Sequence, residues 1–271
     1  MTTYQFFILA EDLNISLSFK LIIIKREIFM RTFMFFIGLL VMTASANAQA
    51  VWLSYSYGVS PDKEKVFAAT IDKFTKTEAF KKFNGTMIFT LNAFNGSNDE
   101  THGLQVIYKS MEDYENLMGE IRNDPDFITF RKGLSQHSSF ENESLFQWVA
   151  GFGQAASTGN RAYLAQFNMV TDPMGYVGAI SSNMGKPFMK DMPGGFDIWQ
   201  SLAGGAPGLT HVVVYNYDKL SDGFNFVNNS IKNPEFTNFI GSLSKYRKPL
   251  AQTATYGLKT YGPLSPADMR Q

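Results

Sequence analysis

Apolar and polar positions along the chain form short alternating segments, separated by stretches in which apolar residues recur at helical spacing. Residues 51–57, VWLSYSY, alternate as a half-buried strand does. After the turn Ser60-Pro61-Asp62, the apolar residues recur every three or four positions and predict a helix that reaches Phe80. The remaining elements follow in order: strands at 87–94 and 104–108, a helix at 111–121 and a strand at 145–152. The predicted order is β-α-β-β-α-β.

The same pattern occurs a second time. Residues 101–153 and 210–262 align without a gap at a constant offset of 109, and eleven of the 53 positions are identical, against roughly three expected from composition. The identical pairs are Thr101/Thr210, His102/His211, Tyr108/Tyr217, Asp113/Asp222, Asn116/Asn225, Pro125/Pro234, Phe127/Phe236, Phe130/Phe239, Leu134/Leu243, Ser135/Ser244 and Gly153/Gly262. We conclude that the chain contains two copies of one unit.

The front half of the second copy agrees more loosely with the first. Residues 163–169 are the predicted counterpart of 51–57, and Thr171-Asp172-Pro173 again offers a capping oxygen followed by proline at a helix start. The helix predicted at 174–192 is richer in glycine and serine than its counterpart. The predicted division is a first unit at 49–153, a linker at 154–160, a second unit at 161–262 and a tail at 263–271.

The N-terminal region predicts export. Residues 30–48 combine Arg31, the apolar run Phe33–Met42 and Ala46-Asn47-Ala48, the small–x–small pattern of a signal-peptidase site. The run is shorter than the roughly 20 residues of a membrane span, and a buried core helix is the alternative. We expect a periplasmic or secreted protein with no membrane segment after leader removal. Because residues 1–29 precede a complete signal peptide, we expect translation to start at Met30, with a long leader as the alternative.

Composition excludes several classes of site. Lys+Arg and Asp+Glu balance at 24 each, whereas a nucleic-acid-binding protein usually shows a basic excess. The chain has no cysteine, which excludes disulfides, thiolate zinc sites, iron–sulfur clusters, a cysteine nucleophile and a lipoprotein anchor. The sequence contains no GxSxG elbow, no phosphate-binding glycine motif and no metal cluster, and no two acidic residues share a predicted strand face.

The element order is that of the ferredoxin-like unit, an antiparallel four-stranded sheet with helices on one face. Two copies can cover each other's bare face by packing sheet to sheet. The arrangement resembles the dimeric α/β-barrel superfamily, which includes antibiotic-biosynthesis-type monooxygenases, EthD-like proteins and stress-responsive barrels. The resemblance covers nearly the whole mature chain and rests on element order and duplication. It implies an α+β fold of two tandem ferredoxin-like units in a single-chain pseudo-dimeric barrel, so we expect a monomer.

The repeated ionisable residues of interest are His102 and His211, each after a threonine at the start of a third strand. By strand periodicity, His102 shares a face with Tyr108, and His211 with Tyr217. If that face lines the space between the sheets, both pairs meet in a common apolar cavity, where histidine is a candidate base and tyrosine a candidate hydrogen-bond donor. Alternatively, the Thr-His pair satisfies buried backbone groups, and the sequence leaves open which face points inward.

The three tryptophans, Trp52, Trp148 and Trp199, all fall on predicted strands. They are candidates for ligand stacking, and core packing is the alternative. His137 has no counterpart in the second copy, where Tyr246 stands, and we expect it to be solvated. No cofactor is predicted. Non-covalent haem is the alternative because some duplicated barrels of the superfamily bind haem, and His137 is then a conceivable ligand.

Three classes of function remain open. The first is an exported protein that binds a small apolar or aromatic molecule within the duplicated barrel. The second, implied by the resemblance, is a cofactor-independent monooxygenase-like enzyme with His102 or His211 as base and Tyr108 or Tyr217 as orienting residue. The third is a structural or partner-binding protein whose two units only pack together.

Overall fold

The computed structural model describes residues 49–96 and 98–270. The predicted leader and its cleavage site lie outside the described residues. The described residues form one compact unit. Within the described residues, no helix is both long enough and apolar enough to span a membrane.

The first repeat follows the predicted order, with each helical segment split in two. Its elements are β1 (Val51–Gly58), α2 (Glu64–Phe74), α3 (Glu78–Lys81), β2 (Gly85–Phe94), β3 (His102–Tyr108), α4 (Met111–Ile121), α5 (Pro125–His137) and β4 (Ser139–Gly153). The first helix begins at Glu64 because residues 61–63 form a turn, and it does not run on to Phe80 as predicted. It ends at Phe74, and Thr77 then caps the separate helix α3 by accepting from Phe80 N.

The second repeat has the same order. Its elements are β5 (Ala162–Val170), α6 (Pro173–Met184), η1 (Pro187–Met189), β6 (Gly195–Gly204), β7 (His211–Tyr217), α7 (Leu220–Ser230), α8 (Pro234–Ser242), η2 (Leu243–Lys245) and β8 (Arg247–Tyr261), followed by η3 (Pro266–Met269). The helix predicted at 174–192 is shorter, since α6 ends at Met184 and a 3₁₀ turn follows. Proline begins α6 as expected, and prolines also begin α5 and α8, each after a capping Asp or Asn.

The eight strands form one closed barrel in the order β1-β3-β2-β8-β5-β7-β6-β4. The last strand of each repeat, 15 residues long, joins the two sheets. Residues 139–147 of β4 pair with β1 and residues 144–153 pair with β6, while β8 pairs with β5 and then with β2. The predicted pseudo-dimeric barrel is confirmed, and shared hydrogen bonds join its sheets.

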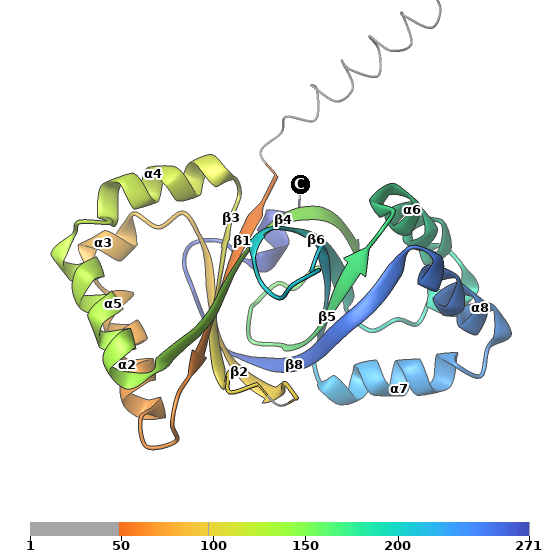
Figure 1. Ribbon diagram of the computed structural model, residues 1–271, viewed down its shortest axis with the longest axis horizontal. Coiled ribbons are helices and arrows are strands. Elements are labelled where there is room, and N and C mark those ends of the chain that lie inside the picture. The colour runs from red at the N-terminus through yellow and green to blue at the C-terminus, as the bar shows by residue number, and fades with distance from the viewer. Residues whose placement is uncertain (1–48, 97, 271) are drawn as a thin grey trace, which may run out of the picture. The chain divides into compact units, whose positions relative to one another are not determined.

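The barrel lies between two groups of helices (Figure 1). Helices α2–α5 pack on one side of it and α6–α8 on the other. Every strand therefore has one side-chain face under a helix group and the other in the barrel lumen, and the far ends of β4 and β8 lie under the helices of the other repeat. On β3, Leu104 and Tyr108 belong to the core beneath the first helix group, whereas Ile107 belongs to the lumen core.

The pairing of the strands corrects one predicted equivalence. Val51 lies opposite Tyr108 and Ala162 lies opposite Tyr217, so Ala162 rather than Tyr163 corresponds to Val51. A shift of one residue exchanges the two faces of a strand. Tyr163 consequently points into the lumen, as Trp52 does in the first repeat.

Candidate functional site

The two repeated histidines occupy equivalent buried positions at the start of β3 and β7. His102 and His211 are each 3% exposed. The Nδ1 atom of His102 lies 3.0 Å from Thr101 Oγ1, and that of His211 lies 3.1 Å from Thr210 Oγ1. The ring of His102 stacks on Phe89 with centroids 5.5 Å apart. Burial lowers the pKa of both imidazoles, so both are neutral at pH 7.

The threonine of each Thr-His pair ties the third strand to the end of the first. The Val59 backbone N–H donates to Thr101 Oγ1 at 2.8 Å, and the Val170 N–H donates to Thr210 Oγ1 at 2.7 Å. Both amides therefore have a partner that the strand ladder does not supply. These bonds agree with the alternative interpretation of the Thr-His pair, in which it satisfies buried backbone groups.

The structure does not bring the predicted histidine and tyrosine together. His102 and Tyr108 stand at opposite ends of one strand, roughly 20 Å apart at about 3.3 Å per residue. Both lie on the face beneath the helices, and the same holds for His211 and Tyr217, whose strand face packs in the cores under the second helix group. The condition for one common cavity between the sheets is therefore not met, because that face does not look into the barrel.

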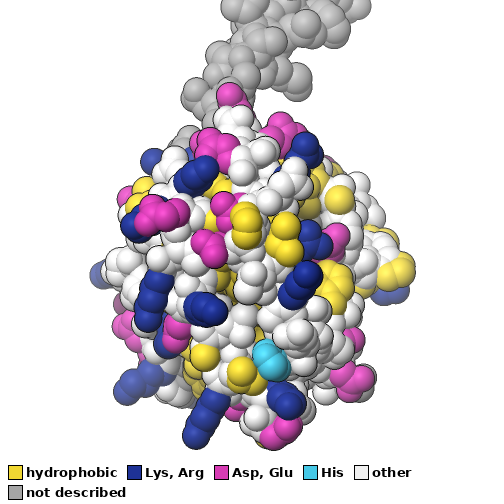
Figure 2. All heavy atoms as spheres, turned by 90° about the vertical axis from the view of Figure 1, so that its left-hand side faces the viewer, with side chains coloured by type: hydrophobic (Ala, Val, Ile, Leu, Met, Phe, Trp, Pro, Cys, Tyr) yellow, Lys and Arg dark blue, Asp and Glu magenta, His cyan; other side chains and the backbone are white. Residues whose placement is uncertain are grey.

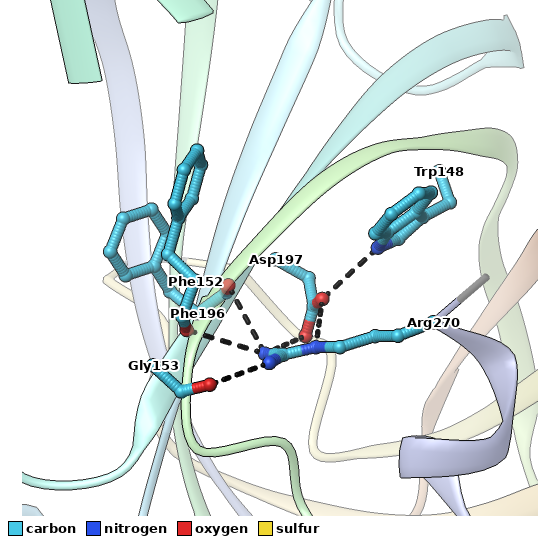
Figure 3. A network of polar contacts seen from close by, with 6 residues as sticks. All are labelled: Trp148, Phe152, Gly153, Phe196, Asp197 and Arg270. Carbon is cyan, nitrogen blue, oxygen red and sulfur yellow. Dashed lines mark hydrogen bonds and ion pairs between the residues drawn. The ribbon is translucent and has the colours of Figure 1, made fainter. Parts of the chain in front are cut away.

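The three tryptophans line the barrel lumen. The ring of Trp52 stacks on Phe146 at 4.6 Å and meets Trp199 edge-on at 5.6 Å. The indole N–H of Trp52 donates to Gln105 Oε1, and that of Trp148 donates to Asp197 Oδ1 at 3.1 Å (Figure 3). The tryptophans thus both pack in the lumen core and border its open space.

A cavity of about 540 Å³ lies in the first repeat between the sheet and its helices. Its floor is the helix-facing side of β1 and β3, with Leu53, Leu104 and Val106. Its roof is formed by α4 and α5, where Leu117 and Phe130 point down to the sheet. The volume is in the range of small-molecule sites, which are mostly apolar with a few convergent polar groups.

Four tyrosines supply polar groups to this cavity: Tyr55, Tyr57, Tyr108 and Tyr114. The rings of Tyr108 and Tyr114 meet edge-on at 5.6 Å. Burial, with neighbouring phenols as a smaller cause, raises the pKa of Tyr55 and Tyr108, so both hydroxyls keep their protons at neutral pH. Burial, together with Glu143, raises the pKa of Tyr57 to about 12. Protonated phenols can donate hydrogen bonds to an oxygen of a bound molecule.

Two opposite charges stand at the exposed edge of the cavity. Arg131 on α5 and Glu143 on β4 line it and are both exposed to solvent. Glu143 raises the pKa of Tyr55 and Tyr57, and Arg131 acts in the opposite sense, so both charges act on the same phenols. The outer face of this helix group carries acidic and basic side chains interspersed with single apolar ones (Figure 2).

The second repeat keeps Tyr108 as Tyr217 but differs at the other polar positions named above. Val106 corresponds to Tyr215, which is partly buried and packs on Phe196 with ring centroids 5.1 Å apart. Tyr114 corresponds to Gly223. The remaining exchanges place Gln166 at the position of Tyr55, Asn168 at that of Tyr57, Ile240 at that of Arg131 and Gln252 at that of Glu143. Apart from Tyr108, the polar residues named for this cavity are thus specific to the first repeat.

A haem or a metal ion would need side chains that can ligate it. Among the described residues that line the cavity there is no histidine, so none is placed there to ligate a haem iron. His137 ends α5, is partly buried rather than solvated, and its buried Nδ1 has no hydrogen-bond partner among the described residues. Within the part of the chain that the structure describes, no group of three acidic or histidine side chains could hold a metal ion.

Comparison with known proteins places the fold. No protein-family model matches the chain, and no curated protein matches it. A candidate monooxygenase from Fusobacterium nucleatum matches with a TM-score of 0.55 and 11% identity, over 80% of this chain and 96% of that one. A candidate monooxygenase from Lactobacillus acidophilus matches with a TM-score of 0.53 and 8% identity, over 79% of this chain and 96% of that one. An anthrone oxidase-like protein matches with a TM-score of 0.53 and 12% identity, over 79% of this chain and 93% of that one.

The chain has the dimeric α/β-barrel fold. Of the histidines, tyrosines and tryptophans proposed from the sequence as site residues, only Tyr108 lines the cavity of the first repeat. Tyr55 and Tyr57 were visible only as part of an alternating strand, and Arg131 and Glu143 as ordinary surface charges. The available signal was their exchange between the repeats, because these four residues, like Tyr114, are replaced in a copy that retains the buried core.

Proposed function

We propose that the protein binds a small aromatic molecule in the cavity of the first repeat, and that it does so after export. The observation that carries this proposal is an apolar cavity of about 540 Å³ that four tyrosines line. Apolar walls stabilise an aromatic ring by removing it from water, and the tyrosine hydroxyls would hold an oxygen substituent in one orientation. Export rests on the leader sequence alone.

A second candidate is a cofactor-independent oxygenase acting on the same class of molecule. The fold shared with candidate monooxygenases and an anthrone oxidase-like protein favours it. In such a reaction Glu143 would accept a proton from an acidic aromatic substrate, while Arg131 and the phenols stabilise the resulting anion. The anion gives electrons to dioxygen. One oxygen atom replaces two hydrogens of a methylene group as a carbonyl, and the other leaves as water.

The binding proposal is tested with 1-naphthol and anthrone as probes, using calorimetry and the melting temperature. Val106→Tyr introduces the residue that the second repeat has at this position, so it fills the cavity with a side chain that this fold already accepts. We expect this variant to stay folded and to lose the probe-induced rise in melting temperature. Val227→Tyr makes the same chemical change at an exposed site on α7 and should retain the response. Equal binding by both variants would place the ligand elsewhere.

The tyrosine hydroxyls offer a second matched pair. Tyr108→Phe should weaken the binding of 1-naphthol by about threefold to tenfold, since a neutral hydrogen bond contributes roughly 0.5–1.5 kcal/mol. Tyr217→Phe makes the same change in the second repeat and should have no effect. Equal losses in the two variants would mean that the hydroxyl of Tyr108 acts on stability and not on the ligand.

Oxygen consumption separates an enzyme from a binder. With anthrone and dioxygen, an enzyme should show turnover that Glu143→Gln abolishes while calorimetric binding persists. A binder takes up the probe without turnover, and a structural protein shows neither response. Native mass spectrometry of the protein from an exporting host supplies a first test, because a bound compound appears as extra mass that denaturation removes.

A further inference from the structure

The barrel lumen contains a second cavity that differs chemically from the one under the helices. Its volume is about 140 Å³. Its wall contains all three tryptophans of the chain and a series of hydroxyl and amide side chains: Ser54, Ser56, Thr90, Asn92, Gln105, Asn216, Thr253 and Thr255. An apolar core would exclude such side chains unless they had partners, because burying an unpaired hydroxyl or amide destabilises the fold.

The end of the lumen at which β1 and β5 begin is covered by the C-terminal tail. Met269 is 1% exposed and belongs to the core that includes Trp52 and Trp199. Arg270 then bonds to Asp197 and to backbone carbonyls at the end of β4 and the start of β6 (Figure 3). We take the opposite mouth, where β1 and β2 end, as the entrance.

One lumen side chain has a buried oxygen to which no described residue donates a hydrogen bond. Asn216 is 3% exposed, lines the cavity, and its Oδ1 makes no hydrogen bond to any described residue. One of the two carboxyl groups that line the lumen, that of Asp197, is already paired with Arg270. Asp197 accepts from Arg270 Nε at 2.7 Å and from Nη2 at 3.0 Å, and also accepts from Trp148. The remaining carboxyl group, Glu100, lies near the entrance, and burial raises its pKa.

We propose that the lumen is a second ligand site, which takes a small neutral polyol or sugar. Hydroxyl groups both donate and accept hydrogen bonds, and so match a wall of serine, threonine and asparagine side chains. Indole rings beside those groups offer a flat apolar surface to the C–H faces of such a molecule. The size agrees, because a cavity of about 150 Å³ holds one molecule of benzene. This site is independent of the aromatic ligand proposed above.

Tryptophan fluorescence tests the proposal directly. All three tryptophans line the lumen, whereas the cavity of the first repeat is lined by tyrosines, so selective excitation of tryptophan reports on the lumen. Glycerol, erythritol and xylose are titrated into the full chain purified from an exporting host. We expect a saturable change in emission for at least one of them. An absent or linear response overturns the proposal, as does tighter binding of benzene or of putrescine than of any polyol.

Two lumen variants and one outside it supply the controls. Ser54→Leu places an apolar side chain in the lumen and should abolish the polyol response. If that variant fails to fold, Thr255→Val removes one hydroxyl at nearly constant volume and should weaken binding about threefold to tenfold. Val106→Tyr fills the other cavity and should leave the response unchanged. Polyols also stabilise proteins through exclusion from their surface. If a polyol affects all variants equally, the effect is this general stabilisation, and the proposal of a lumen site is overturned.

Discussion

Removal of the guanidinium of Arg270 tests how strongly the C-terminal tail stabilises the barrel. This side chain donates to both carboxylate oxygens of Asp197, at 2.7 and 3.0 Å, and to the Gly153 carbonyl at 2.9 Å. The two charged side chains are only 16% and 21% exposed. Arg270→Ala therefore leaves a mostly buried carboxylate with the indole N–H of Trp148 as its remaining side-chain partner.

The size of the effect follows from this burial. Breaking a fully buried ion pair by removing one partner destabilises a protein by about 3–5 kcal/mol. The pair here keeps some contact with water and Asp197 keeps one donor, so we expect a loss of about 2–3 kcal/mol in the free energy of unfolding. For a protein of this size, that corresponds to a fall in melting temperature of about 4–12 °C.

Thermal and urea unfolding followed by circular dichroism measure this loss. Lys82→Ala serves as the matched control, because it removes an ion pair with Glu120 at 3.3 Å in which both side chains are about half exposed. Such surface pairs contribute about 0–1 kcal/mol. If Arg270→Ala costs no more than Lys82→Ala, the tail does not clamp the barrel. In a double-mutant cycle, Asp197→Asn combined with Arg270→Ala should cost less than the sum of the single changes.

Two further predictions concern the repeated Thr-His pair. Thr101→Val should lower the free energy of unfolding by about 1–3 kcal/mol, because the Val59 amide loses its acceptor. Thr210→Val should lower it by a similar amount in the second repeat, where the Val170 amide loses its acceptor. Urea unfolding that finds both variants as stable as the unchanged protein contradicts this prediction. Burial lowers the pKa of His102, so the unfolded chain binds a proton at this residue more readily than the folded chain does. The contribution of His102 to the free energy of unfolding should be fully present above about pH 6.5 and should decline as the pH falls below that value. His102→Gln should reduce this decline in unfolding curves measured across that range.

The sequence by itself determined the duplication and the order of elements. A constant offset of 109 residues, alternating strands and Pro at helix starts were sufficient for these, since they are local properties of the chain. The breaks it missed were also local: the turn at 61–63 and the cap at Thr77 compete with a helical pattern that appears continuous through Phe80. Periodicity cannot detect such a break, because the apolar spacing continues across it.

Only the tertiary structure decided which strand face meets which neighbours. Both faces of β3 carry apolar residues, because helices cover one and the closed barrel covers the other, so the pattern of one strand does not distinguish them. That choice placed the tryptophans in the lumen and Tyr108 beneath the helices, and it separated His102 from Tyr108 along one strand. The cavity of the first repeat combines Tyr55, Arg131 and Glu143 from three elements. Their proximity arises from packing between distant segments, which no local pattern records.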